Sequence, residues 1–315
     1  MDSVCPEVEQ VADAIASMET RGAATIADAA AGALAAQAEW IETEDPEAFR
    51  AAMRAAARTL ADTRPTAVSL PNALRYVLHG MHGGTVSDLR TSVVTRAEAF
   101  RTDLDRAQGR LGRVGAGRLR DGDTVMTHCH STAAVAVVRA AVEQGKHVEA
   151  YVKETRPRNQ GHITAKELRE LGVPVTLIVD NAAHRFLDEC DHVIVGADSI
   201  AADGSVINKV GTSGLAVLAR ERGVPVMVAA GTLKLHPDTL TGQAVEIEQR
   251  AEREVIDDES REEIGEITVR NPAFDVTPPR HLDAIVTEKG QFPPESIVSL
   301  MRELYGDQVD EPWSE

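Results

Sequence analysis

Residues 121–153 read DGDTVMTHCHSTAAVAVVRAAVEQGKHVEAYVK, and this stretch decides the fold. Two short runs rich in β-branched residues, 123–127 and 148–153, flank an apolar helical segment that starts after Ser131 and stops at Gly145. A strand, a helix and a second strand in this order form the repeating unit of parallel sheets. The stretch therefore predicts an α/β domain built on a parallel sheet.

The same alternation continues along the rest of the chain. Further apolar, β-branched runs separated by helical segments occupy residues 174–179, 192–196, 224–230 and 283–287. Strands that alternate with helices predict a Rossmann-like, doubly wound parallel sheet over residues 121–315. The very acidic stretch 243–270 is expected to form a solvated helix and loop.

Residues 1–120 have a different pattern. From Val8 onward Ala, Arg and Glu dominate, and apolar residues recur with helical spacing. Breaks are expected at Arg21-Gly22 and in the segment TRPTAVSLPNALRYV (63–77), where each residue before a proline resists the helical conformation. The sequence therefore predicts a helical N-terminal domain, 1–120, ahead of the α/β domain, 121–315.

The charge of the chain limits its partners. The 315 residues include 50 acidic and 33 basic side chains, which give a net charge of −17. Such a body repels phosphate backbones and acidic headgroups, so we expect neither a nucleic acid nor a membrane as partner. No apolar run approaches the ~20 residues of a bilayer span, and the first ten residues lack a cationic or apolar signal region, so a cytoplasmic protein is expected.

The basic residues are unevenly divided between Lys and Arg. Only six are Lys, whereas 27 are Arg. Avoidance of Lys together with an excess of acid suits a halophilic type of surface, which stays hydrated in a high-salt cytoplasm. A Lys retained in such a chain therefore deserves individual inspection.

The three cysteines do not form a recognisable framework. Cys5, Cys129 and Cys190 are far apart and match neither a disulfide pattern nor a zinc motif, so reduced thiols are expected. Cys129 lies between the strand 123–127 and the next helix, at the edge where open parallel sheets bind ligands. The helix dipole and a protonated neighbouring histidine would favour its thiolate, which would make it a base or nucleophile.

Two other interpretations of Cys129 remain open. The side chain is equally suited to filling a strand end as a half-buried thiol. A metal site formed by His128, Cys129 and His130 is disfavoured, because consecutive residues that leave a strand point to alternate sides.

A second polar cluster, Gly196-Ala197-Asp198, follows the apolar strand 192–196. Small residues before Asp198 would deliver its carboxylate to the ligand-binding edge, desolvated enough to have a raised pKa and to act as an acid. The alternative is that Asp198 caps the next turn.

Cationic residues indicate an anion site. Asn208-Lys209-Val210-Gly211-Thr212 precedes a helix whose free backbone N–H groups, with the Lys, suit a phosphate, and Lys234 follows the strand 224–230. Arg21-Gly22-Ala23-Ala24 and Arg64 would add positive charge, although an inter-helix turn and a solvated loop explain them too. Gly115-Ala116-Gly117 lacks the third glycine and the strand context of a dinucleotide site. No metal or cofactor is expected.

Several stretches of the chain resemble the superfamily shared by sugar-phosphate isomerases and the regulatory subunits of the initiation-factor guanine-nucleotide exchange factor. They are THCHS (127–131), ETRPRNQGHITAKEL (154–168), GADSI (196–200), GSVINKVGT (204–212) and NPAFDVTPPRHLDAIVTEKG (271–290). With METRGAATIADAA (18–30) and TRPTAVSLPNALRYV, the resemblance covers nearly the whole chain.

Three branches of that superfamily have to be separated. The translation-factor subunits lack the Cys and Asp pair, which this chain retains as Cys129 and Asp198. Methylthioribose-1-phosphate isomerases share the pair, but they follow the Cys with an Asn-Ala-Gly run and a Gly-Tyr-Gly insertion, whereas Cys129 is followed by His130-Ser131. The chain is most similar to the archaeal ribose-1,5-bisphosphate isomerase branch, and the other two functions remain alternatives.

The resemblance implies an activity and a set of roles. Cys129 would be the proton acceptor and Asp198 the proton donor in converting α-D-ribose 1,5-bisphosphate to D-ribulose 1,5-bisphosphate, through ring opening and an enol phosphate. The implied contacts to the substrate are Arg21, Gly22, Ala23, Ala24, Arg64, Asn208, Lys209 and Lys234. A hydride shift from C2 to C1 stays an alternative route. The resemblance also implies a homo-oligomer, a dimer or a hexamer, and a place in nucleoside or AMP breakdown.

Overall fold

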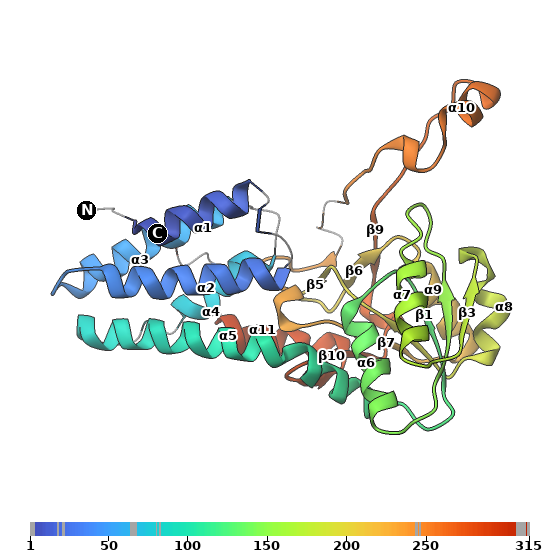
Figure 1. The fold of residues 1–315 in the computed structure, drawn as a ribbon, viewed down its shortest axis with the longest axis horizontal. Helices are drawn as coiled ribbons and strands as arrows, with labels where there is room; N and C mark the ends of the chain where they lie inside the picture. The colour runs from blue at the N-terminus through green and yellow to red at the C-terminus, as the bar shows by residue number, and fades with distance from the viewer. Residues whose placement is uncertain are drawn as a thin grey trace. The chain divides into compact units, whose positions relative to one another are not determined.

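The computed structural model describes residues 4–17, 19–20, 23–63, 68–79, 81, 83–242, 245, 247–306 and 313. The chain forms two compact units (Figure 1). Unit 1 comprises Met1–Ala107, Leu233–Asp238 and Ser299–Glu315, and unit 2 comprises Gln108–Thr232 and Thr239–Val298. The boundary that we predict at residue 120 falls inside unit 2, and the sequence did not predict that 233–238 would belong to unit 1.

Unit 1 is helical, as predicted. Its helices are α1 (Pro6–Ala16), α2 (Ala23–Trp40), α3 (Pro46–Ala61), α4 (Ser69–Leu78), the first part of α5 (Val86–Ala116) and most of α11 (Ile297–Tyr305). Helix α3 starts at Pro46, because the carboxylate of Asp45 accepts a hydrogen bond from the Glu47 N–H and Pro46 needs no partner in the first turn. Alanine-rich α2 lets neighbouring helices approach closely around a core that includes Phe49 and Leu74.

Helix α4 holds the returning segment 233–238 in unit 1. The Asn72 Nδ2 donates to the carbonyl oxygen of Leu235 at 2.5 Å, and the buried guanidinium of Arg75 forms an ion pair with Asp238 at 2.6 Å. The same guanidinium lies 5.7 Å from the ring centroid of Trp313. A buried charge needs such partners, so these polar contacts hold the segment against α4.

Unit 2 contains the predicted doubly wound sheet. Its strands are β1 (Thr124–Thr127), β2 (Glu149–Lys153), β3 (Val175–Ile178), β4 (His192–Val195), β7 (Val226–Ala229), β10 (Ala284–Thr287) and β11 (Gly290–Phe292). They run in the order β11-β10-β7-β4-β1-β2-β3, and all neighbours are parallel except β10 and β11. The strand order reverses between β1 and β4, which is where such sheets bind ligands. The predicted fold class is confirmed.

Helices connect the parallel strands of unit 2 (Figure 1). They are α6 (Thr132–Glu143), α7 (Gly161–Glu170), η1 (Asp180–Ala182), α8 (Ala183–Phe186), η2 (Leu187–Glu189) and α9 (Thr212–Arg222). Because parallel crossovers are right-handed, the helices of the two halves of the sheet cover opposite faces. Gly115 of α5 packs against α6, since a Cβ there would lie 2.4 Å from Val137 Cγ2. This close packing accounts for the glycine at position 115.

A second, antiparallel sheet in unit 2 was not predicted. Strand β6 (Val206–Lys209) pairs with both β5 (Ser199–Ala201) and β9 (Phe274–Thr277). These strands are short, and the β5–β6 turn depends on Gly204 with a φ of +82°. Asn208 and Lys209, which precede the predicted helix, therefore belong to a strand. Between β6 and β9 the acidic stretch carries η5 (Glu252–Glu254) and α10 (Asp258–Ile264), the latter far from the sheets in Figure 1.

The remaining short elements are η3 (Thr232–Lys234), β8 (Leu235–His236), η6 (Pro279–His281) and η7 (Pro294–Ser296). Among the described helices, none combines the length and the apolar character needed to cross a bilayer.

Candidate active site

The sheet brings Cys129 and Asp198 to adjacent strand ends. Cys129 follows β1 and Asp198 follows β4, and these two strands pair in parallel, with Thr127 opposite Ile194. The carboxyl ends of β1 and β4 form the topological switch point, the ligand-binding edge of this architecture. Two residues predicted as an acid–base pair thus lie at one edge of one sheet.

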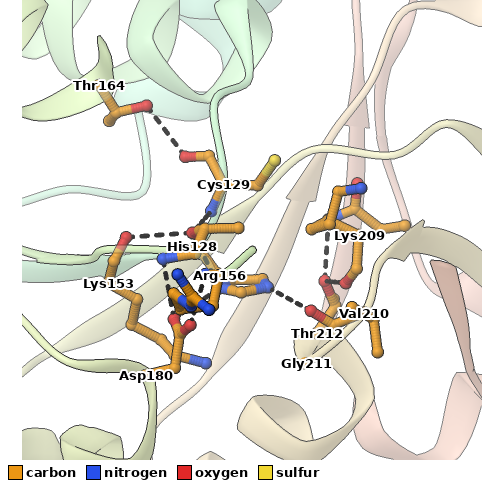
Figure 2. A network of polar contacts seen from close by, with 12 residues as sticks. His128, Cys129, Lys153, Arg156, Thr164, Asp180, Lys209, Val210, Gly211 and Thr212 are labelled. Carbon is orange, nitrogen blue, oxygen red and sulfur yellow. Dashed lines mark hydrogen bonds and ion pairs between the residues drawn. The ribbon is translucent and has the colours of Figure 1, made fainter. Parts of the chain in front are cut away.

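The backbone of Cys129 adopts an unusual conformation. Its φ is +67°, in the left-handed region, which costs a residue with a Cβ about 1–2 kcal/mol. The Cys129 N–H donates to Thr155 Oγ1 at 2.8 Å, and the Cys129 carbonyl accepts from Thr164 Oγ1 at 2.9 Å. Figure 2 shows the sulfur pointing away from the hydrogen-bonded side chain of His128. The strained backbone therefore turns the thiol out of the polar network beneath it.

His128 is part of that network and is not a charged partner of the thiol. Burial, together with the charge of Lys153, lowers the pKa of His128 to about 4. His128 Nε2 lies 2.8 Å from the Val210 carbonyl oxygen, which accepts only, so the neutral ring carries its proton on Nε2. The expectation that a protonated neighbouring histidine assists Cys129 is wrong for His128.

The thiol of Cys129 is also less acidic than we predicted. Burial raises its pKa, and the charge of Asp198 acts in the same direction, whereas the His130 backbone and the charges of Lys209 and Arg250 lower it. The helix dipole does not dominate, because Ser131 is the N-cap of α6 and its hydroxyl accepts from the Ala134 N–H at 3.3 Å. The thiol lies outside the helix terminus.

Asp198 differs from its prediction in one respect. Its side chain is exposed, so the expected desolvation of the carboxylate is wrong. The backbone is nevertheless well defined, since the Asp198 N–H donates to the Ile207 carbonyl at 2.9 Å. That bond ties the residue to β6, the strand that carries Lys209.

Lys209 supplies positive charge to this edge. It is buried on β6, with Nζ 5.1 Å from the ring centroid of Phe274. Burial and the charge of Arg250 lower the pKa of Lys209, and the charges of Cys129 and Asp198 raise it. Asn208, its neighbour, donates through Nδ2 to Thr212 Oγ1 at 3.0 Å. Cys129, Asp198, Asn208 and Lys209 thus share one region of unit 2.

The helix terminus after Lys209 is already occupied. Two backbone N–H groups there donate to the carboxylate of Asp275, that of Gly211 at 2.7 Å and that of Ser213 at 3.1 Å. A side chain from β9 therefore caps these two amides, which are not free for a phosphate, while Asn208 and Lys209 remain predicted phosphate contacts.

The other predicted contacts do not belong to this part of unit 2. Ala23 and Ala24 begin α2, and Lys234 ends η3, all in unit 1. Lys234 was assigned to the α/β domain by its position after a strand, which the structure corrects. Arg21, Gly22 and Arg64 lie outside the described residues.

Four residues at this edge were not predicted from the sequence. Lys153 ends β2 and is buried, with a pKa lowered mainly by burial although Asp180 and Asp275 oppose the shift. Thr155 and Asp180 hold the loop that follows Lys153, because the Asp180 carboxylate accepts from the Thr155 N–H at 2.9 Å. Arg250 lies in the acidic stretch 243–270, which we expected to form only a solvated helix and loop, and its charge lowers the pKa of Cys129. Lys153 offered a signal, as one of only six lysines and the last residue of a predicted strand.

Gly161 fixes the end of the loop 154–160, and its substitution gives a first prediction. A Cβ at Gly161 would lie 1.8 Å from the Lys153 carbonyl oxygen, so the backbone must shift. We expect Gly161→Ala to lower the free energy of unfolding by about 2 kcal/mol, measured by urea denaturation. Gly214→Ala in α9 is the matched control, because no atom lies within 4 Å and a helical alanine stabilises by up to ~1 kcal/mol. Equal stability of the two variants would contradict the close approach.

The chain matches the model of one protein family. That family is described as the initiation factor 2 subunit family, and the match covers residues 19–294. Among curated proteins, the chain is 69% identical over 318 residues to the ribose 1,5-bisphosphate isomerase of Haloterrigena turkmenica, covering 98% of this chain and 97% of that protein. It is also 69% identical over 314 residues to the protein of the same name from Haloferax volcanii, covering 100% and 97%.

A solved structure has the same fold. The crystal structure of 5-methylthioribose 1-phosphate isomerase from Pyrococcus horikoshii OT3 superimposes with a TM-score of 0.66 at 34% sequence identity. The alignment covers 96% of this chain and 88% of that chain. The likeness therefore includes both the helical unit and the α/β unit.

Proposed function

The chain belongs to the initiation factor 2 subunit family, and we infer that it is an isomerase, specifically a ribose 1,5-bisphosphate isomerase. The observation that carries the inference is the 69% identity, over nearly the full length, to two proteins of that name. The site is compatible with the activity, since a thiol, a carboxylate and a lysine gather where a doubly wound sheet binds its ligand.

We propose that the reaction begins with ring opening. In α-D-ribose 1,5-bisphosphate the C1 oxygen carries a phosphate, so the bond between C1 and O4 has to break before C2 becomes acidic. Asp198 in its protonated form donates to O4, which leaves as a hydroxyl. The electron deficiency at C1 then makes the proton on C2 removable.

Cys129 takes part in the second half of the reaction. Its thiolate removes the C2 proton, and the electrons of that bond form the C1–C2 double bond of an enol phosphate. The proton returns from sulfur to C1 while the C2 hydroxyl gives its proton back to Asp198, which produces the C2 carbonyl of D-ribulose 1,5-bisphosphate. Every proton is accounted for within the substrate and the two side chains.

The substrate contacts are part of the same proposal. Lys209 is the best supported of them, because its charge interacts with those of both Cys129 and Asp198. The other proposed contacts to phosphates and hydroxyls are Arg21, Gly22, Ala23, Ala24, Arg64, Asn208 and Lys234. Together they would hold the sugar between acid and base.

Broader properties follow only from the proposed activity. The product would feed a reaction that consumes ribulose 1,5-bisphosphate during nucleoside or AMP breakdown. We also propose a homo-oligomer, a dimer or a hexamer, located in the cytoplasm. The 27 Arg, six Lys and net charge of −17 support a halophilic type of surface.

A side-by-side assay of two substrates tests the function. We expect kcat/KM for ribose 1,5-bisphosphate to exceed that for methylthioribose 1-phosphate by at least about 100-fold, because cations placed for a second phosphate are left unpaired by a methylthio group. Product formation is measured by NMR on the purified protein. The reverse preference would assign the chain to the methylthioribose branch. No turnover of either compound, with co-purification of an initiation factor, would indicate a non-catalytic subunit.

A further inference from the structure

Two residues with side chains adopt the left-handed conformation next to each other in the network beneath the thiol. Cys129 has a φ of +67° and Thr155 a φ of +66°. Thr155 is fully buried and β-branched, and such residues rarely adopt this conformation without compensation from their surroundings. Two adjacent unfavourable conformations at a strand edge therefore need a common explanation.

The hydroxyl of Thr155 links the two segments. It accepts the hydrogen bond of the Cys129 N–H at 2.8 Å, and its own proton is directed to the Lys153 carbonyl oxygen at 3.1 Å. His128 Nδ1, which is unprotonated in the neutral ring, lies 3.3 Å from Thr155 Oγ1 and is a second acceptor for the hydroxyl proton. The hydroxyl thus uses both its donor and its acceptor capacity, which is possible for Thr or Ser and not for an apolar residue.

The backbone of Thr155 is itself held in place. Both carboxylate oxygens of Asp180 accept from this loop, Oδ1 from the Thr155 N–H at 2.9 Å and Oδ2 from the Arg156 N–H at 2.7 Å. These are charge-assisted bonds in a partly buried position, and they offset the unfavourable φ of Thr155. Figure 2 shows Asp180 beneath His128 and Arg156, on the side away from the sulfur.

A second hydroxyl holds the other side of Cys129. Thr164 of α7 is buried and donates through Oγ1 to the Cys129 carbonyl at 2.9 Å. The two threonines therefore satisfy both backbone polar groups of the strained residue, one on each side. A cysteine in an ordinary extended conformation would not present its N–H and C=O to this pair.

We propose that Thr155 is a positioning residue for the reaction, which holds Cys129 in the left-handed conformation and so aims its sulfur at the substrate, with Thr164 as the second support. The proposal rests on the proposed function insofar as Cys129 is the base. The orientation of the thiol can also be measured without any substrate.

The test compares Thr155→Val, which keeps the β-branched shape and removes the hydroxyl, with Thr155→Ser, which retains the hydroxyl. We expect Thr155→Val to lower kcat by about 100-fold with KM within about twofold, because misplacing a reacting group by about 1 Å has an effect of that size. Thr155→Ser restores kcat to within about threefold. If Thr155 had only a structural role, Thr155→Val would change the stability of the protein without lowering kcat selectively relative to KM.

Alkylation of Cys129 by iodoacetamide, followed by peptide mass spectrometry as a function of pH, provides the second readout. Since burial is the main cause that raises the thiol pKa, a change in the orientation of the thiol should shift the pH dependence of alkylation in Thr155→Val. A profile identical to that of the wild type would overturn the proposal, whether or not the protein turns over ribose 1,5-bisphosphate. If Thr155→Val does not fold, the same alkylation experiment is done on Thr164→Val. We expect the same shift of the alkylation profile in that variant, and a profile identical to that of the wild type would contradict the proposal.

Discussion

Cys129→Ser should reduce the turnover of ribose 1,5-bisphosphate by about 10⁴-fold while the protein remains folded. A serine hydroxyl has nearly the size of the thiol, but it is a far weaker acid and cannot supply the anion that removes the C2 proton. The left-handed backbone and its hydrogen bonds to Thr155 and Thr164 do not involve sulfur, so the fold should persist. Turnover is measured by NMR and folding by circular dichroism.

A second cysteine provides the matched control. Cys190 is buried, its thiol donates to the Phe186 carbonyl at 3.4 Å, and burial raises its pKa to about 12. Cys190→Ser keeps that hydrogen bond and should leave turnover within about twofold. Loss of activity in both variants, or undiminished turnover in Cys129→Ser, would remove Cys129 from its proposed role.

The pH dependence of the wild type follows from the same thiol. Because the pKa of Cys129 lies above its ordinary value, the thiol is protonated at neutral pH in the free protein, and the active thiolate becomes more abundant as pH rises. We therefore expect kcat/KM to increase with pH through the neutral range. Cys129→Ser should lack this dependence in any residual activity.

Asp198→Asn should lower kcat by about 10²- to 10⁴-fold, since the amide has nearly the same shape and cannot donate the proton that ring opening requires. The backbone bond from the Asp198 N–H to the Ile207 carbonyl is unaffected. The measurement is turnover of ribose 1,5-bisphosphate at saturating concentration, with KM determined in parallel.

Asp198→Asn has a second, opposite consequence. The charge of Asp198 raises the pKa of Cys129, so its removal should make the thiol more acidic and move the alkylation profile to lower pH. A more reactive Cys129 together with a lower kcat would show that the loss of activity comes from the missing acid, Asp198, and not from damage to the base, Cys129. Asp121→Asn is the control, because Asp121 is exposed and lies just before β1, at its amino end. Full activity of Asp198→Asn would contradict the assignment.

The sequence predicted the main sheet because its periodicity is strong. Runs such as 123–127 and 192–196 are apolar and β-branched, and the helices between them have caps and terminal glycines. The second sheet has strands as short as three residues, β5 among them, without a pattern that distinguishes them from loops. Lys209 was therefore selected from the sequence as a candidate cation, whereas its position on β6 was not predicted.

The site was only partly predictable for a related reason. Cys129 and Asp198 could be selected because polar residues directly after parallel strands lie at the ligand edge. The pKa of the thiol depends on burial and on charges from β6 and the acidic stretch, which no local pattern reveals. Thr155 was missed because a left-handed conformation is normally marked by glycine, and here it is imposed on Thr and Cys by contacts between loops.

The return of residues 233–238 to unit 1 has a consequence for how this protein can be rearranged. The chain passes between the units at 107, 232, 238 and 298, so no single cut separates them. A fragment that ends at Ala107 would leave the buried guanidinium of Arg75 without Asp238 and the amide of Asn72 without the Leu235 carbonyl. Neither unit is a module that gene fusion or recombination can transplant in one piece. The helical unit and the α/β unit are therefore expected to be inherited together.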